Sequence, residues 1–148
     1  RSSGILLGVH FEYCLLDAVE HWRRDRNRGA GLEFSGRFAT RRPDRLGIPA
    51  VENLGSHLFA IHAYALPQST ISEILCGYEE PEARTVSIAD SGRLIETIDF
   101  SVNHEPIIQR FVAKFESALG GGSFPFTLDF AMQVWESLDA FREKQTSK

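Results

Sequence analysis

The feature that most constrains the fold is a pair of alternating segments on either side of a turn at residues 90–92. In residues 84–89, Val86 and Ile88 alternate with small hydroxyl residues, and residues 94–102 alternate in the same way. A period of two is the pattern of a strand with one buried face. A short turn that contains glycine joins the two strands of a hairpin. The sequence therefore predicts an antiparallel hairpin whose second face is polar.

Further strand and helix patterns are interspersed along the chain. The strand patterns span residues 5–11, 32–40 and 69–78. The helical patterns span residues 12–24, 54–66, 103–119 and a last segment capped by Thr127. This order, together with the hairpin, favours an α+β fold, a mostly antiparallel open sheet with helices packed on one face, in a single domain over residues 1–148. The open face of such a sheet is left to solvent or to the partner in a dimer.

Composition and charge exclude several classes of partner. Apolar residues make up 43% and charged residues 24% of the chain, as in a soluble globular protein. The net charge of -4 argues against a nucleic-acid binder. His57 and His62 interrupt the most apolar run, so no membrane span is expected, and without a signal peptide we expect a cytoplasmic protein. The first residue is Arg1 and the only methionine is Met132, so we expect a piece of a longer polypeptide.

The best candidate for chemistry is the pair Asn53 and His57 in the segment NLGSHL. Four residues apart, they would share one face of a helix and could reach a common ligand. The histidine could then act as a general acid or base near neutral pH, and the amide could orient a substrate hydroxyl. The alternative is a structural histidine whose ring is satisfied between a helix and the sheet. Spacing alone leaves both interpretations open.

We expect no metal site and no cofactor site within this chain. His57 and His62 are five residues apart, whereas a pair of zinc ligands on a helix prefers a spacing of four, and neither cysteine belongs to a C-x-x-C pair. The triple glycine at 120–122 follows a helical pattern and lacks the Lys-Ser/Thr ending of a phosphate-binding loop. It is therefore interpreted as a helix terminator.

Three segments, in this order, resemble the C-terminal domain of the Gfo/Idh/MocA oxidoreductases, the family of glucose–fructose oxidoreductase and inositol dehydrogenase. GVHFEYCLLDAV at 8–19 resembles the family's last nucleotide-domain strand and the following helix. NLGSHL at 53–58 resembles the D-x-G-x-H-L signature. Residues 103–141 resemble the closing pair of helices with their glycine-rich break. The likeness covers nearly the whole chain.

This resemblance implies a sheet of about six mostly antiparallel strands and a homodimer formed through the open face. It also implies a nicotinamide-dependent reaction, with NAD or NADP, at a sugar-like or cyclitol carbon. His57 would contact the reacting hydroxyl and assist proton transfer, and Asn53 would help to bind the substrate. The chain departs from the family pattern at Asn53, where the signature has an aspartate, because an amide cannot take a proton. The family's nucleotide-binding half would lie before residue 1, so we expect this chain alone to be inactive.

Two functions therefore remain open. In the first, the chain is the substrate-binding and dimerisation domain of an NAD(P)-dependent oxidoreductase. In the second, it is a non-catalytic binding or dimerisation module that has kept the fold and lost the chemistry. The missing nucleotide-binding half and Asn53 favour the second for this chain, and the order of the segments favours the first for its parent.

Overall fold

The computed structural model describes residues 15–41, 47–100 and 128–146, together with residues 113, 116 and 120. The strands in this part are β1 (Glu33–Ala39), β2 (Thr70–Gly77), β3 (Ala83–Asp90) and β4 (Arg93–Asp99). The helices are α2 (Glu20–Asp25), η1 (Asn27–Gly29), α3 (Ala50–Ala65) and α5 (Leu128–Thr146). Residues 15–18, just before α2, are also helical. The strand expected at 5–11 and the helix expected at 103–119 lie outside the described residues.

The predicted hairpin is confirmed. β3 and β4 pair antiparallel, with Val86 opposite Ile98, and the turn between them places Gly92 at a φ of 79°. β3 also pairs antiparallel with β1, so that Phe38 lies opposite Arg84. Val86 and Ile88 are fully buried, as the alternation of the hairpin predicts. The α+β class is confirmed as well.

The expectation of about six mostly antiparallel strands is wrong for the part of the chain that the structure describes. Four strands form one mixed sheet in the order β2-β1-β3-β4, and β1 pairs parallel with β2. The physical reason is the 16-residue helix α3 between these two strands. It carries the chain back along the length of the sheet, so β2 starts at the same end as β1 and runs in the same direction.

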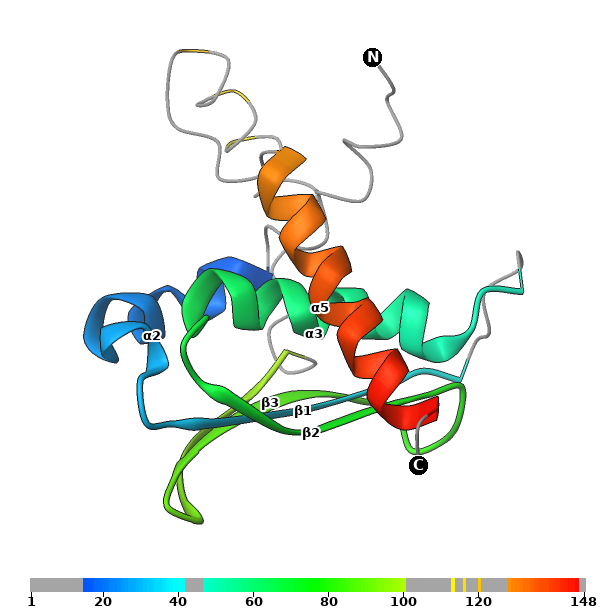
Figure 1. Cartoon of the computed structure of the whole chain (residues 1–148), viewed down its shortest axis with the longest axis horizontal. Helices are drawn as coiled ribbons and strands as arrows, with labels where there is room; N and C mark the ends of the chain where they lie inside the picture. Colours follow the sequence, from blue (N-terminus) through cyan, green and yellow to red (C-terminus); the bar gives the residue numbers. More distant parts are fainter. Residues whose placement is uncertain are drawn as a thin grey trace.

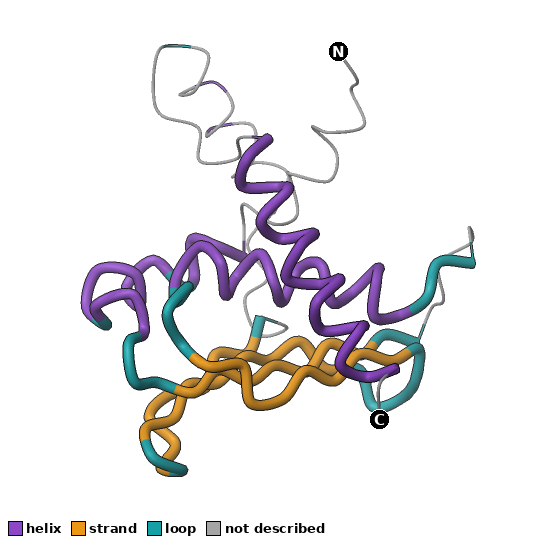
Figure 2. The backbone as a smooth tube through the Cα atoms, viewed as in Figure 1, coloured by secondary structure: helices purple, strands orange, loops and turns teal. Residues whose placement is uncertain are grey.

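The helices cover one face of the sheet, as expected (Figure 1). α3 packs on β1 and β2, and α5 crosses over α3 (Figure 2). The side chains between these layers are buried and form the core; the largest of them are Trp22, Phe34, Phe38, Phe59, Leu58, Ile61, Leu66, Ile88 and Leu138. The opposite face of β1 carries Glu33, Ser35 and Arg37, which are partly exposed. It is therefore the polar face that the alternation predicts.

The helix α3 begins earlier than expected and ends where proline predicts. It starts at Ala50, four residues before the predicted start at Leu54, and Pro49 is its N-cap residue. It ends at Ala65, two residues before Pro67, which cannot continue a helix. The earlier start adds a full turn before Leu54. As a result Asn53 and His57 both lie within regular helix.

Candidate functional site

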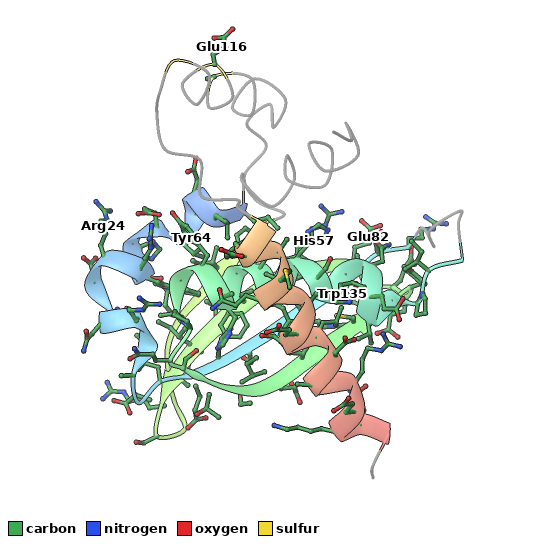
Figure 3. The ribbon with its side chains drawn as sticks, turned by 45° about the horizontal axis from the view of Figure 1, so that its top comes forward. Arg24, His57, Tyr64, Glu82, Glu116 and Trp135 are labelled. Carbon is green, nitrogen blue, oxygen red and sulfur yellow. The ribbon has the colours of Figure 1, made fainter. Side chains whose placement is uncertain are left out.

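His57 lies in the middle of α3 (Figure 3). It lines a small cavity between this helix and the sheet. The cavity has a volume of about 150 Å³ and is lined by Phe38, Ala39, Leu54, His57, Ala83 and Arg84. The ring centroids of His57 and Phe38 are 6.4 Å apart, and the Nδ1 atom of His57 is buried. The imidazole therefore sits where β1 and β3 face the helix.

The surroundings of His57 favour its neutral form. Burial, as the larger cause, and the positive charge of Arg84 together lower its pKa from 6.5 to about 4. At pH 7 the ring is consequently neutral and has one nitrogen that donates and one that accepts hydrogen bonds. Such a ring can accept a hydrogen bond from a hydroxyl group in the cavity. It is a weak base, and it does not supply a proton near neutral pH.

Arg84 is the residue of this site that our sequence prediction missed. It lies on β3 at the same parity as Val86 and Ile88, so its side chain starts on the face that the helices cover. Its register partner on β1 is Phe38, which is buried. The sequence does contain a sign of this site. Arg84 is a charged residue at a position of β3 where the alternation of apolar and polar residues predicts a buried side chain. A charged residue at such a position is uncommon unless it has a partner or a function.

Asn53 does not line the cavity. Its Nδ2 donates a hydrogen bond of 3.1 Å to the hydroxyl of Tyr78, which in turn donates one of 2.6 Å to the backbone carbonyl of Ile48. This chain of hydrogen bonds joins the start of α3 to the end of β2. The structure thus places Asn53 and His57 on one helix but gives only His57 to the cavity. Their joint role in binding a substrate stays a prediction.

His62 shows what a purely structural histidine in this helix looks like. It is buried, and its Nε2 donates a hydrogen bond of 3.0 Å to the backbone carbonyl of Ser69. Burial lowers its pKa, and the hydrogen bond to Ser69 opposes part of that effect. Its ring packs 5.3 Å from that of Phe34. In the described ranges, no three His, Cys, Asp or Glu side chains gather where they could hold a metal ion.

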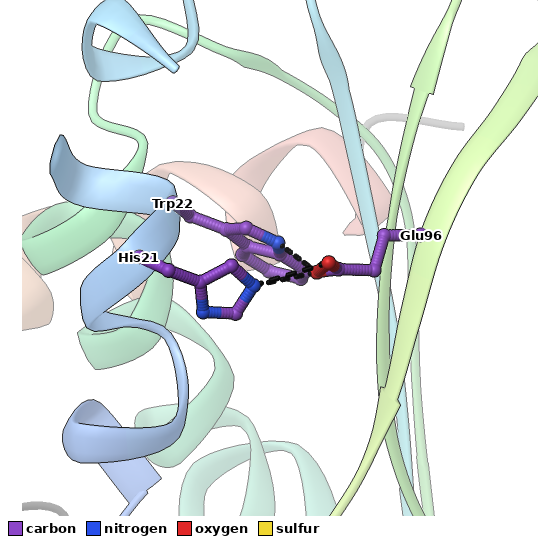
Figure 4. A network of polar contacts seen from close by, with 3 residues as sticks. All are labelled: His21, Trp22 and Glu96. Carbon is purple, nitrogen blue, oxygen red and sulfur yellow. Dashed lines mark hydrogen bonds and ion pairs between the residues drawn. The ribbon is translucent and has the colours of Figure 1, made fainter. Parts of the chain in front are cut away.

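A second polar cluster joins α2 to β4 (Figure 4). The Nε1–H of Trp22 donates to the carboxylate of Glu96 at 2.5 Å, and His21 Nε2 donates to it at 2.7 Å. Glu96 has the same parity as Ile98, so it is a second charged residue at an inward strand position. Its donors come from a helix 74 and 75 residues away. This cluster links the helix α2 to the strand β4, and none of its three residues lines the His57 cavity.

A larger groove runs between the edge strand β2 and the second half of α5. Its volume is about 700 Å³, and its lining includes Phe59, Ile71, Phe141 and Lys144. It contains neither His57 nor Asn53. The two candidate residues from the sequence therefore belong to the smaller cavity and to the α3–β2 junction.

None of the helices in the described ranges is long and apolar enough to cross a membrane. Comparisons with protein-family models, with curated proteins and with solved structures found no match for the chain.

Proposed function

We propose that this chain is the substrate-binding and dimerisation domain of an NAD(P)-dependent oxidoreductase that acts on a sugar-like or cyclitol hydroxyl. One observation carries the proposal: the histidine of the N-x-G-x-H-L segment lines a cavity of about 150 Å³. The other histidine of the same helix, His62, instead forms a hydrogen bond with the backbone carbonyl of Ser69. The resemblance of the sequence to the Gfo/Idh/MocA C-terminal domain supplies the reaction class.

In this proposal His57 holds the substrate hydroxyl. A neutral imidazole accepts a hydrogen bond from that hydroxyl and receives its proton when the carbon is oxidised. The apolar side chains of Phe38 and Leu54 line the cavity and support the carbon skeleton beside it. His57 is thus the catalytic candidate, and the hydroxyl is the group that the cavity recognises.

The cofactor does not fit the described part of this chain. No G-x-G-x-x-G segment lies between a strand and a helix there, so these residues offer no Rossmann-type site for a dinucleotide. NAD or NADP, which would accept the hydride, is assigned to the nucleotide-binding half of a parent protein. Calorimetry on the 148-residue chain should show no binding of either dinucleotide. Micromolar affinity of this chain for NAD or NADP would contradict the assignment of the cofactor to the nucleotide-binding half of the parent.

The second candidate function, a non-catalytic binding module, is favoured by one specific observation. Asn53 stands where the family signature has an aspartate, and its amide is committed to Tyr78. The position that would carry a carboxylate is used to fasten the start of α3 to the end of β2. The coding sequence upstream of Arg1 separates the two functions: a G-x-G-x-x-G after a strand supports the enzyme, and a long upstream region without one supports the module.

Binding of the hydroxyl compound is tested on the chain itself. With histidine labelled with ¹³C, myo-inositol and D-glucose should shift the imidazole signal of His57 saturably at millimolar concentration. The signal of His62, on the same helix, is the internal control and should stay in place. His57→Gln identifies the signal by removing it. If His57 and His62 respond alike, or if neither responds, His57 is not a substrate-binding residue.

Dimerisation through the open face is part of the same proposal. That face carries the polar side chains of β1, and Leu75 of β2, 48% exposed, lies beside Arg37 in register. Light scattering at high protein concentration should give twice the mass of one chain, and Leu75→Asp should halve it. A monomeric wild type at these concentrations would remove the dimer from the proposal.

A further inference from the structure

The cavity beside His57 brings a guanidinium and an imidazole together. Among the residues that the structure describes, its lining consists of one cation, one imidazole and four apolar residues, and none of these six is acidic. Arg84 contributes the cation, from a β3 position that faces the helices. It makes other polar interactions as well. Its planar guanidinium carries five N–H donors, enough to hold a ligand oxygen in addition to them.

A guanidinium beside a neutral imidazole is selective for one pattern of ligand groups. Two parallel N–H groups of an arginine match the two oxygens of a carboxylate. The neighbouring imidazole matches a hydroxyl, which can both donate and accept a hydrogen bond. His57 and Arg84 are close enough for the charge of Arg84 to lower the pKa of His57. Both groups also line the same cavity of about 150 Å³, so one small molecule in it can contact both.

We propose that the cavity binds the carboxylate end of a hydroxy acid, with Arg84 holding the carboxylate and His57 the adjacent hydroxyl. This inference rests on the proposed function and narrows its substrate class from a neutral sugar to a sugar acid, such as an aldonic or a uronic acid. Arg84 is then the specificity-determining residue. A neutral polyol offers the guanidinium no carboxylate to bind.

The size of the cavity agrees with recognition of one end of such a molecule. A cavity of about 150 Å³ holds roughly six non-hydrogen atoms, as a benzene-binding cavity of that volume does. A carboxylate and the hydroxyl-bearing carbon next to it fill this space. The rest of an aldonic acid would extend out of the cavity.

Two matched pairs of probes test the proposal on the chain as it exists. D-glycerate is compared with glycerol, and D-gluconate with D-glucitol; in each pair a carboxylate replaces a hydroxymethyl group. Binding is followed through the imidazole signal of His57. The wild type should bind each acid at least about tenfold more tightly than its neutral partner, because a paired arginine adds charge-assisted hydrogen bonds.

Three variants test whether Arg84 causes the preference for the acid over its neutral partner. Arg84→Met removes the charge but keeps the length of the side chain, and it should abolish the preference for the acid. Arg37→Met is the matched control, because Arg37 lies on β1 on the opposite face of the same sheet, and it should keep the preference. Arg84→Lys retains the charge without the planar fork and should give an intermediate preference. Amide spectra establish that each variant is folded.

The outcomes separate this inference from the proposed function. Equal binding of acid and neutral probes overturns the carboxylate site and leaves the hydroxyl-binding function standing. A preference that persists in Arg84→Met also overturns it. If neither member of a pair shifts the His57 signal, both proposals fail. The wild-type comparison needs no variant, so it decides even if Arg84→Met does not fold.

Discussion

Gly36 of β1 lies directly beneath Leu58 of α3, so close that a Cβ atom at position 36 would stand 2.5 Å from Cδ2 of Leu58. Leu58 is fully buried, and the helix rests on the sheet at this point. The next residue along α3 toward its N-terminus is His57. The absence of a side chain at Gly36 thus sets how closely the helix that carries His57 approaches the sheet.

Gly36→Ala should destabilise the protein by about 1–3 kcal/mol, the usual cost of overpacking a well-filled core. Urea denaturation at pH 7 measures it. The double variant Gly36→Ala/Leu58→Ala is the control, since the methyl group then meets empty space. In that background the glycine substitution should cost much less. An unchanged free energy of unfolding in Gly36→Ala alone would show that Leu58 can move aside freely.

Gly55→Ala should have the opposite effect. Gly55 lies inside α3, and a Cβ there would meet Cys76 Sγ at 3.6 Å and Leu138 Cδ1 at 3.7 Å, which are ordinary contacts. Alanine is preferred to glycine within a helix, so the free energy of unfolding should rise by about 0.4–1 kcal/mol. The same urea titration measures it. Destabilisation would mean that α3 and α5 leave no room for a methyl group.

His57 makes the stability depend on pH. Its pKa is about 4 in the folded protein and 6.5 when it is exposed. Below pH 6.5 the unfolded chain takes up a proton that the folded chain refuses, so stability falls between pH 6.5 and pH 4. His57 alone contributes a loss of about 3.5 kcal/mol at most, since the shift is about 2.5 pKa units and one unit corresponds to about 1.4 kcal/mol.

Denaturation between pH 7 and pH 4 tests this dependence in the wild type and in His57→Gln, which should lose less stability over the range. Arg84→Met tests the contribution of the Arg84 charge to the pKa shift of His57. It removes the smaller cause of the shift and should raise the pKa of His57 without restoring 6.5. An NMR titration that placed His57 near 6.5 in the native wild type would contradict its burial in the cavity.

Tyr78→Phe tests whether Asn53 is structural. The substitution removes the hydroxyl that joins the amide of Asn53 to the carbonyl of Ile48. Loss of these two partly buried hydrogen bonds should cost about 1–2 kcal/mol. If the bond from Asn53 matters, the cost of Tyr78→Phe should shrink in an Asn53→Ala background. Additive effects would mean that the two side chains are not coupled.

Much of the sheet can be predicted from the sequence, because a strand with one buried face alternates between apolar and polar residues. Phe34 and Phe38 are buried where the alternation places them, and the β3–β4 hairpin follows from its turn. The parallel pairing of β1 with β2 cannot be predicted in this way, because it depends on the path of the helix α3 between them. The same holds for the bond between Asn53 and Tyr78, whose partners are 25 residues apart. Spacing within one helix paired Asn53 with His57, whereas the tertiary fold turned Asn53 toward another residue.

The carboxylate of Glu96 should be the acid-sensitive link between α2 and β4. Partial burial raises its pKa, but hydrogen bonds from His21 and Trp22 and the charges of His21 and Arg26 outweigh this effect, so the pKa lies below 4.5. A carboxylate with a lowered pKa contributes stability above pH 4.5, and that contribution is lost as the pH falls through the folded pKa. Glu96→Ala should cost about 1–3 kcal/mol at pH 7, since two donors lose a charged acceptor.

Glu96→Gln separates the charge from the hydrogen bond. The amide oxygen of glutamine can still accept from Trp22 Nε1, so the variant should lose only part of this stability at pH 7, and the loss should shrink below pH 4.5. Glu73→Gln, at an exposed position of β2, is the matched control and should change the free energy of unfolding by less than about 0.5 kcal/mol. If Glu96→Ala and Glu73→Gln have the same small effect at pH 7, the cluster at Trp22 does not hold the two layers together.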